Sequence, residues 1–214
     1  PLYNLGCCYY YGHGVQQSNV EALELWKLSL QDPNMGDVAM MLGYFYRYGI
    51  VANKDFDQSI RCYGAATFSN LFDIEDKVKI HILIGDCYCD YDNPTKKIDE
   101  AIKKYKWAIE NHKNPEAMYK LSVLYRLGLG VNKNFTEANA LLKQSYDLGY
   151  TIAAAEIGKI YLEGQGVTIS IPEALKWINL AIDHGDFEAH FLLGTLYENG
   201  KGVIQDFRKA ADLF

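Results

Sequence analysis

The stretch "YLEGQGV", residues Tyr161–Val167, decides the fold because closely similar stretches recur along the chain. The others are "YYGHGV" at Tyr10–Val15, "YRLGLGV" at Tyr125–Val131 and "YENGKGV" at Tyr197–Val203. A glycine pair ahead of a helix fits either a loop that cradles a phosphate or the turn of a structural repeat. The surrounding residues distinguish these two structures.

The recurring stretches come into register on one small residue, which we call the anchor. The six anchors are Gly6, Gly43, Gly85, Ser122, Gly158 and Gly194, at intervals of 37, 42, 37, 36 and 36 residues. A tyrosine follows each anchor by three residues. A small residue follows each anchor by sixteen: Ala22, Ser59, Ala101, Ala138, Ala174 and Ala210. Such a period is typical of solenoids of stacked repeats, and the small residues indicate close contact between helices.

Each repeat is predicted to be a pair of helices. Apolar residues at helical spacing surround the anchors, as Ile157, Ile160 and Tyr161 surround Gly158. Twelve residues after the anchors come Ser18, Asp55, Lys97, Asn134, Ser170 and Asp206, five of which are good helix N-caps. In four repeats a Glu or Gln three residues later completes a capping box. We therefore predict an all-α chain of about eleven or twelve helices with no strand.

The glycine pairs fall between the two helices of a repeat, where a left-handed residue ends the first helix at little cost. The pairs are Gly12/Gly14, Gly128/Gly130, Gly164/Gly166 and Gly200/Gly202. A phosphate loop would need a preceding strand and a further Gly or a Gly-Lys-Ser/Thr sequence, and no copy is followed by one. The pairs are predicted to be helix C-caps.

Charge and hydropathy exclude some functions. The net charge is −6 and lysines are scattered among acidic residues, which argues against a nucleic-acid-binding protein. No apolar run approaches the roughly 18 to 20 residues of a membrane helix. A cytoplasmic location is slightly favoured over the secretory or periplasmic alternative.

The residues with potential chemistry have simple structural interpretations. The cysteines Cys7, Cys8, Cys62, Cys87 and Cys89 lack the spacing of a disulfide framework, which favours reduced thiols. Cys87 and Cys89 diverge by about 200° on a helix, which favours packing over a metal site. The histidines show no ligand spacing, so we predict no catalytic residue, no metal and no cofactor.

The sequence "NFT" at Asn134–Thr136 has two interpretations that remain open. It is a glycosylation sequon if the chain enters the secretory pathway. Asn134 is also the expected N-cap of its helix, with Glu137 completing the box. A modified Asn keeps its side-chain carbonyl, so both can hold.

The fixed columns of small anchor, tyrosine, Gly-x-Gly-Val and alanine resemble the Sel-one-like repeat, a relative of the tetratricopeptide repeat. The resemblance covers about Leu2 to Phe214. It implies a right-handed α-solenoid of about six helix-turn-helix repeats of 36–42 residues, the first and last incomplete. We expect a single domain, residues 1–214, that is an excerpt of a longer chain.

The resemblance implies a non-enzymatic scaffold or adaptor that holds a protein or peptide partner. The alternative is a hydrolase of the kind proposed for cysteine-rich relatives. Those relatives carry regularly placed cysteine pairs, and this chain does not. We expect no nucleic-acid partner and no membrane insertion within this stretch of the chain.

The third repeat departs from the pattern. Its sequence "LIGDCYCDYDNPTKKIDEA" has Tyr91 and Asn93 where the glycines belong. Six residues beyond the 36-residue period fall near Thr67–Asp76. We expect a longer loop between the second and third repeats.

In tetratricopeptide arrays, the concave face is lined by positions six and three before the anchor and one and four after it. We select the predicted partner-binding residues from these columns in this chain and from the matching residues of the first repeat. They are Tyr3, Tyr10, Met40, Tyr44, Arg47, Lys79, Ile82, Asp86, Glu116, Tyr119, Arg126, Lys159, Leu162, Phe191 and Glu198. Arg47 and Arg126 share one column, and as surface residues they are expected to contribute little to folding.

Overall fold

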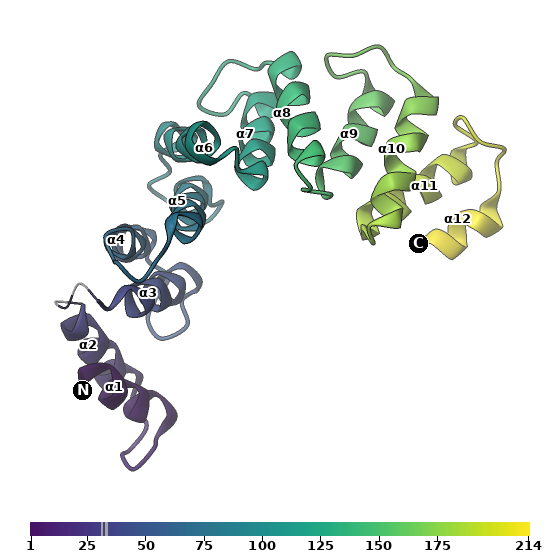
Figure 1. Cartoon of the computed structure of the whole chain (residues 1–214). Helices are drawn as coiled ribbons and strands as arrows, with labels where there is room; N and C mark the ends of the chain where they lie inside the picture. Colours follow the sequence, from purple (N-terminus) through teal and green to yellow (C-terminus); the bar gives the residue numbers. More distant parts are fainter. Residues whose placement is uncertain (31, 33) are drawn as a thin grey trace. The chain divides into compact units, whose positions relative to one another are not determined.

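A computed structural model of the chain describes residues 1–30, 32 and 34–214, and all regular elements within them are α-helices (Figure 1). The predicted all-α class and helix number are confirmed for these residues. None of the described helices is long and apolar enough to span a bilayer. The helices are α1 (Leu2–Tyr11), α2 (Asn19–Ser29), α3 (Gly36–Tyr48), α4 (Phe56–Ala66), α5 (Ile74–Cys89), α6 (Ile98–His112), α7 (Pro115–Leu127), α8 (Phe135–Asp147), α9 (Ala153–Glu163), α10 (Ile171–Asp183), α11 (Phe187–Asn199) and α12 (Phe207–Leu213).

The helices form two compact units, residues 1–108 and 109–214, and each is described by itself. The two helices of a repeat lie side by side, as α3 and α4 do in the first unit and α7 and α8 in the second (Figure 1). The second helix of a repeat also packs on the first helix of the next, as α4 does on α5 and α8 on α9. Within each unit the helices are therefore stacked hairpins.

The anchors are the points where the two helices of a repeat come closest. A Cβ atom on any of the five glycine anchors would lie only 2.5 to 2.8 Å from the side chain twenty residues later. Atoms cannot pack at that distance, so these positions exclude a side chain. The five facing side chains are Trp26, Tyr63, Tyr105, Ile178 and Phe214.

The fourth repeat has Ser122 as its anchor. The residue twenty positions later is Leu142, and each is only 1% exposed. Ser122 keeps its hydroxyl satisfied by donating to the carbonyl of Tyr119 at 2.6 Å. A hydroxyl that bonds to its own helix lets serine fill this buried position.

The small residues sixteen positions after the anchors are buried, as predicted. Ala22, Ala101 and Ala138 are completely inaccessible. Ser59 is also inaccessible, and its hydroxyl donates to the carbonyl of the anchor Gly43 at 2.7 Å. This column therefore lies in the same helix–helix contact as the anchors.

The glycine-rich turns are left-handed C-caps, as predicted. Gly12, Gly49, Gly128, Gly164 and Gly200 end the first helices with φ between 64° and 74°. In all six repeats the backbone N–H twelve residues after the anchor donates to the carbonyl of the tyrosine three residues after it, at 2.9 to 3.3 Å. The turn is therefore closed by a backbone bond that any residue except proline can donate.

The predicted N-caps of the second helices are also confirmed. Their side-chain oxygens accept a hydrogen bond from a backbone N–H in the first turn of the helix that follows. The residues are Ser18, Asp55, Asn134, Ser170 and Asp206.

The third repeat closes its turn differently. Asn93 is 3% exposed, and its side-chain amide donates to the carbonyl of Cys87 at 2.7 Å. In the fourth repeat the equivalent carbonyl, that of Leu124, accepts backbone N–H groups from the glycine turn. The Asn93 side chain therefore replaces the missing glycines.

The additional residues of the third repeat lie where they were predicted, but only some of them form loop. Residues 67–73 connect α4 to α5, and α5 has 16 residues whereas α3 has 13. Asp73 caps α5 by accepting from the N–H of Asp76 at 2.9 Å. This cap allows part of the insertion to be helical.

The anchor contact predicts the relative cost of two substitutions in the fifth repeat. Gly158→Leu places a side chain where even a Cβ would lie 2.8 Å from Ile178, and is expected to destabilise by about 1 to 3 kcal/mol or more. Ser170→Ala removes one N-cap and is expected to cost less, within about 0.5 to 2 kcal/mol. Urea denaturation of both variants measures the order, and the reverse order would show that the anchor is not tightly packed.

Candidate interaction surface

The predicted partner-binding residues lie on the first helices of the repeats, but their exposure differs. Five are exposed: Tyr3, Tyr44, Lys79, Phe191 and Glu198. Nine are partly buried: Tyr10, Met40, Arg47, Asp86, Glu116, Tyr119, Arg126, Lys159 and Leu162. One, Ile82, is buried. The predicted columns therefore mix contact positions with packing positions.

Ile82 was wrongly predicted to face a partner, since it is only 2% exposed. Ile80 and Ile84 on the same helix are buried in a cluster with Tyr63. Ile82 points about 200° away from Ile80 around the helix, so α5 is covered on two opposite sides. A helix in the middle of a stack has no free apolar face at this position.

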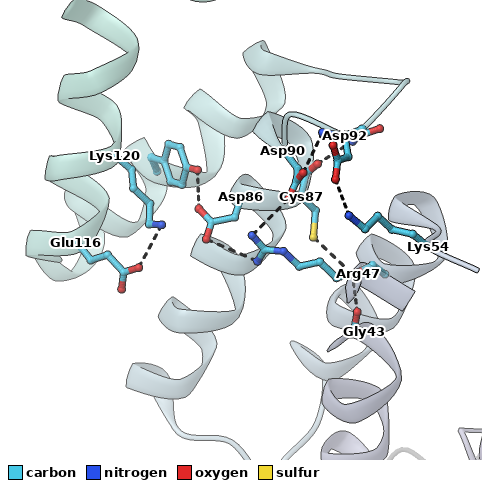
Figure 2. Close-up of polar contacts among 12 residues, drawn as sticks. Gly43, Arg47, Lys54, Asp86, Cys87, Asp90, Asp92, Glu116 and Lys120 are labelled. Carbon is cyan, nitrogen blue, oxygen red and sulfur yellow. Dashed lines mark hydrogen bonds and ion pairs between the residues drawn. The ribbon is translucent and has the colours of Figure 1, made fainter. Parts of the chain in front are cut away.

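Arg47 is not the surface residue that the sequence predicted. Its side chain is 12% exposed, and its guanidinium lies 3.7 Å from the carboxylate of Asp86 and 3.8 Å from that of Asp90 (Figure 2). Asp86 also accepts a hydrogen bond from the hydroxyl of Tyr105 at 2.8 Å. Arg47 therefore joins α3 to α5, that is, the second repeat to the third.

Arg126 has a similar role in the second compact unit, so the prediction that it is a free surface residue is also wrong. Its side chain is 22% exposed and lies 3.0 Å from the carboxylate of Glu156. Lys159 approaches the same carboxylate at 2.8 Å and also pairs with Glu188. These ion pairs connect the first helices α7, α9 and α11 of three successive repeats.

An exposed tyrosine pair lies beside Arg47 on α3. Tyr44 is 50% and Tyr48 52% exposed, and their ring centroids are 4.6 Å apart. The guanidinium carbon of Arg47 lies 5.4 Å from the ring centroid of Tyr48. Tyr48 is not among the predicted residues, because the columns carried over stop four residues after the anchor. The tyrosine directly after Arg47, at the last position of this helix, was the signal available in the sequence.

The buried thiols do not resemble an activated nucleophile. All five cysteines are reduced thiols, as predicted. Cys87 lies 3.5 Å from the hydroxyl of Ser59, and burial raises the pKa of the Cys87 thiol. Burial also raises the pKa of Cys62 to about 11. A reactive cysteine needs a lowered pKa instead.

Two further predictions concern metal binding and glycosylation. The described residues contain no group of three or more His, Cys, Asp or Glu side chains that could hold a metal ion. Asn134 acts as the N-cap of α8, because its side-chain oxygen accepts from the N–H of Glu137 at 3.1 Å. Glycosylation at Asn134 stays an open prediction.

Comparison with known families identifies the repeat. The family model described as Sel1 repeat matches residues 2–31, 37–67, 115–150, 151–186 and 187–214. The chain therefore belongs to the Sel1 repeat family, whose members in general form helical scaffolds for protein interactions. The third repeat lies outside the matched ranges, yet it keeps the anchor contact between Gly85 and Tyr105.

Solved structures show the same fold. A Sel1 repeat protein from Oxalobacter formigenes is 22% identical with a TM-score of 0.79, over 99% of this chain and 59% of that one. The c5321 antigen of uropathogenic Escherichia coli, which has an SLR fold, is 24% identical with a TM-score of 0.68, over 99% of this chain and 44% of that one. This chain therefore spans about half the length of these two structures. The similarity establishes the α-solenoid fold of Sel1 repeats.

The position of Arg47 predicts that it contributes to folding. Arg47→Glu would place a third carboxylate beside Asp86 and Asp90, and we expect a loss of about 1 to 3 kcal/mol in the free energy of unfolding. Lys103→Glu on α6 is the control, since that side chain is 68% exposed. The control should change stability by less than about 0.5 kcal/mol. Equal denaturation midpoints for both variants would contradict the assignment.

His81 predicts a pH dependence of stability. Its ring packs on Trp107 with centroids 4.1 Å apart, and burial, together with the charge of Lys104, lowers the pKa of His81 from 6.5 to about 4. Between these values the unfolded chain binds a proton that the folded chain does not, so stability falls as the pH drops from about 6.5 towards 4.

His81→Phe keeps an aromatic ring at this position and removes the titrating group. We expect the variant to lose less stability than wild type between about pH 7 and about pH 5 in urea denaturation. The same loss in both proteins would mean that His81 does not titrate as described.

Proposed function

We propose that this chain is a non-enzymatic scaffold that binds a protein or peptide partner on the face formed by its first helices. This is the face expected to be concave in the solenoid. Membership of the Sel1 repeat family supports the general role. The exposed Tyr44–Tyr48 pair is the observation that carries the assignment of the surface.

The tyrosine pair has the physical properties of an interface anchor. Tyrosine supplies a large contact area with few rotatable bonds and is enriched at binding hot spots. Tyr44 also lies against Phe45, with ring centroids 6.4 Å apart, and Phe45 packs on Tyr10 at 5.9 Å. Because the half-exposed rings already lie against other side chains, they lose little conformational freedom when a partner covers them.

Arg47 contributes to this surface by orienting Tyr48 rather than by contacting the partner. Because Asp86 and Asp90 hold its guanidinium, Arg47 presents its side chain to the ring of Tyr48 in a fixed place. A cation near the face of an aromatic ring is attracted to it, which favours one orientation of Tyr48. The surface is therefore preorganised by the contact between the second and third repeats.

The first helices of the second compact unit suit the same class of partner. Phe191 is 60% exposed, and Glu188 and Lys159 place opposite charges on neighbouring helices. Mixed charges with exposed aromatic rings favour a protein or peptide ligand over a polyanion.

The test is affinity capture with the full chain, comparing wild type with the Tyr44→Ala/Tyr48→Ala variant by quantitative mass spectrometry. We expect the variant to lose specific partners with at least about a tenfold reduction, since hot-spot truncations cost about 2 kcal/mol or more. Both side chains are half exposed, so the melting transition should change little.

Phe68→Ala/Tyr91→Ala is the matched control. These aromatic residues are 85% and 90% exposed and lie in connections rather than on first helices. Partners retained by the tyrosine variant but lost by the control would place the binding surface on the connections and contradict the proposal.

A further inference from the structure

A cleft of about 440 Å³ lies in the first compact unit, beside the turns of the second and third repeats. One wall is formed by residues 54–57, which end the α3–α4 turn and begin α4. The other wall is formed by residues 92–95 of the α5–α6 turn. Figure 2 shows Lys54 and Asp92, one from each wall, pointing toward one another.

The cleft coincides with the unusual turn of the third repeat. In the second compact unit, the second glycine of a turn packs directly on the first residue of the preceding repeat's second helix. A Cβ on Gly166 would lie 2.5 Å from Phe135, and one on Gly202 would lie 2.0 Å from Ile171.

The equivalent position in the third repeat is Asn93, whose side chain is turned inward. Its amide donates to Cys87, and its oxygen accepts from the N–H of Thr95 at 2.9 Å and from the Thr95 hydroxyl at 3.0 Å. Phe56, which corresponds to Phe135 and Ile171, is buried in the core. The glycine contact seen at Gly166 and Gly202 is therefore replaced, and the cleft lies at this place.

The walls of the cleft carry an excess of negative charge. Lys54 pairs with Asp92 at 2.6 Å, and this contact lowers the pKa of Asp92. Asp55 uses one carboxylate oxygen, Oδ1, to cap α4 at the N–H of Gln58. Asp57 is exposed and forms no ion pair with any other described residue. The residues that line the cleft thus carry three carboxylates and one ammonium group.

We propose that this cleft binds a cationic side chain, arginine or lysine, supplied by a protein partner. Its volume lies within the range of about 300 to 1,000 Å³ that is usual for ligand sites. Six of its eight lining residues have polar or charged side chains. Carboxylates bind guanidinium and ammonium groups through strong charge-assisted hydrogen bonds.

This site is separate from the first-helix face and adds a second contact to it. It depends on the proposed scaffold function only because a partner must supply the cation. A small probe can therefore test the cleft without any partner, and failure of the cleft leaves the tyrosine surface untouched.

The experiment titrates the full chain with N-acetyl-L-arginine amide and follows backbone amide shifts by NMR. We expect saturable shifts at residues 54–57 and 92–95, with a Kd on the order of millimolar. N-acetyl-L-citrulline amide has nearly the same shape without the charge and is expected to leave these amides unchanged. Equal shifts with the citrulline probe, or none with the arginine probe, would overturn the proposal.

Three variants distinguish recognition of charge from a structural effect. Asp57→Asn should weaken binding of the arginine probe about two- to fivefold. Lys54→Met removes the competing ammonium and should tighten it by a similar factor. Asp99→Asn occupies the position of Asp57 in the third repeat, lies outside the cleft, and should leave binding unchanged. Weaker binding by Lys54→Met would contradict the proposed competition.

Discussion

The contact between the anchor and the side chain twenty residues later is the constraint on which each repeat depends. A glycine in the first helix leaves room for a large residue of the second helix, such as Trp26 or Tyr63, and each of these is only 1% exposed. Burying such a side chain stabilises by about 1.5 to 3 kcal/mol. The contact also fixes how closely the two helices approach. The glycine C-cap and the N-cap then only have to join two helices already held at that distance.

Stacking of repeats uses ion pairs in addition to apolar clusters such as that of Tyr63 with Ile80 and Ile84. In the first compact unit Arg47 pairs with Asp86 and Asp90, and in the second Arg126 pairs with Glu156. These side chains lie in the columns from which partner contacts were predicted. Arg47 and Arg126 are therefore held by neighbouring repeats, whereas Tyr44 and Tyr48 are exposed. This division explains why tyrosines, rather than arginines, are the better candidates for contact with a partner.

The sequence predicted what depends on local chemistry. The helix C-caps, the N-caps and the burial of the alanine column follow from residue type and spacing, and all are observed. The burial of Ile82 could not be predicted, because it depends on helices that cover α5 from two sides. The pairing of Arg47 depends on a carboxylate 39 positions away, which spacing within one repeat does not reveal. The column twenty residues after the anchor was visible as six large apolar residues but shows no single residue type.

A double-mutant cycle between Gly43 and Tyr63 tests the central contact most directly. A Cβ on Gly43 would lie 2.5 Å from the ring of Tyr63, so Gly43→Ala should destabilise the wild-type chain. In a Tyr63→Ala background the ring is absent, and the same substitution should cost much less. We expect a coupling free energy of about 0.5 to 3 kcal/mol from urea denaturation of the four proteins. Strictly additive effects would show that the anchor and this ring do not meet, and would contradict the account.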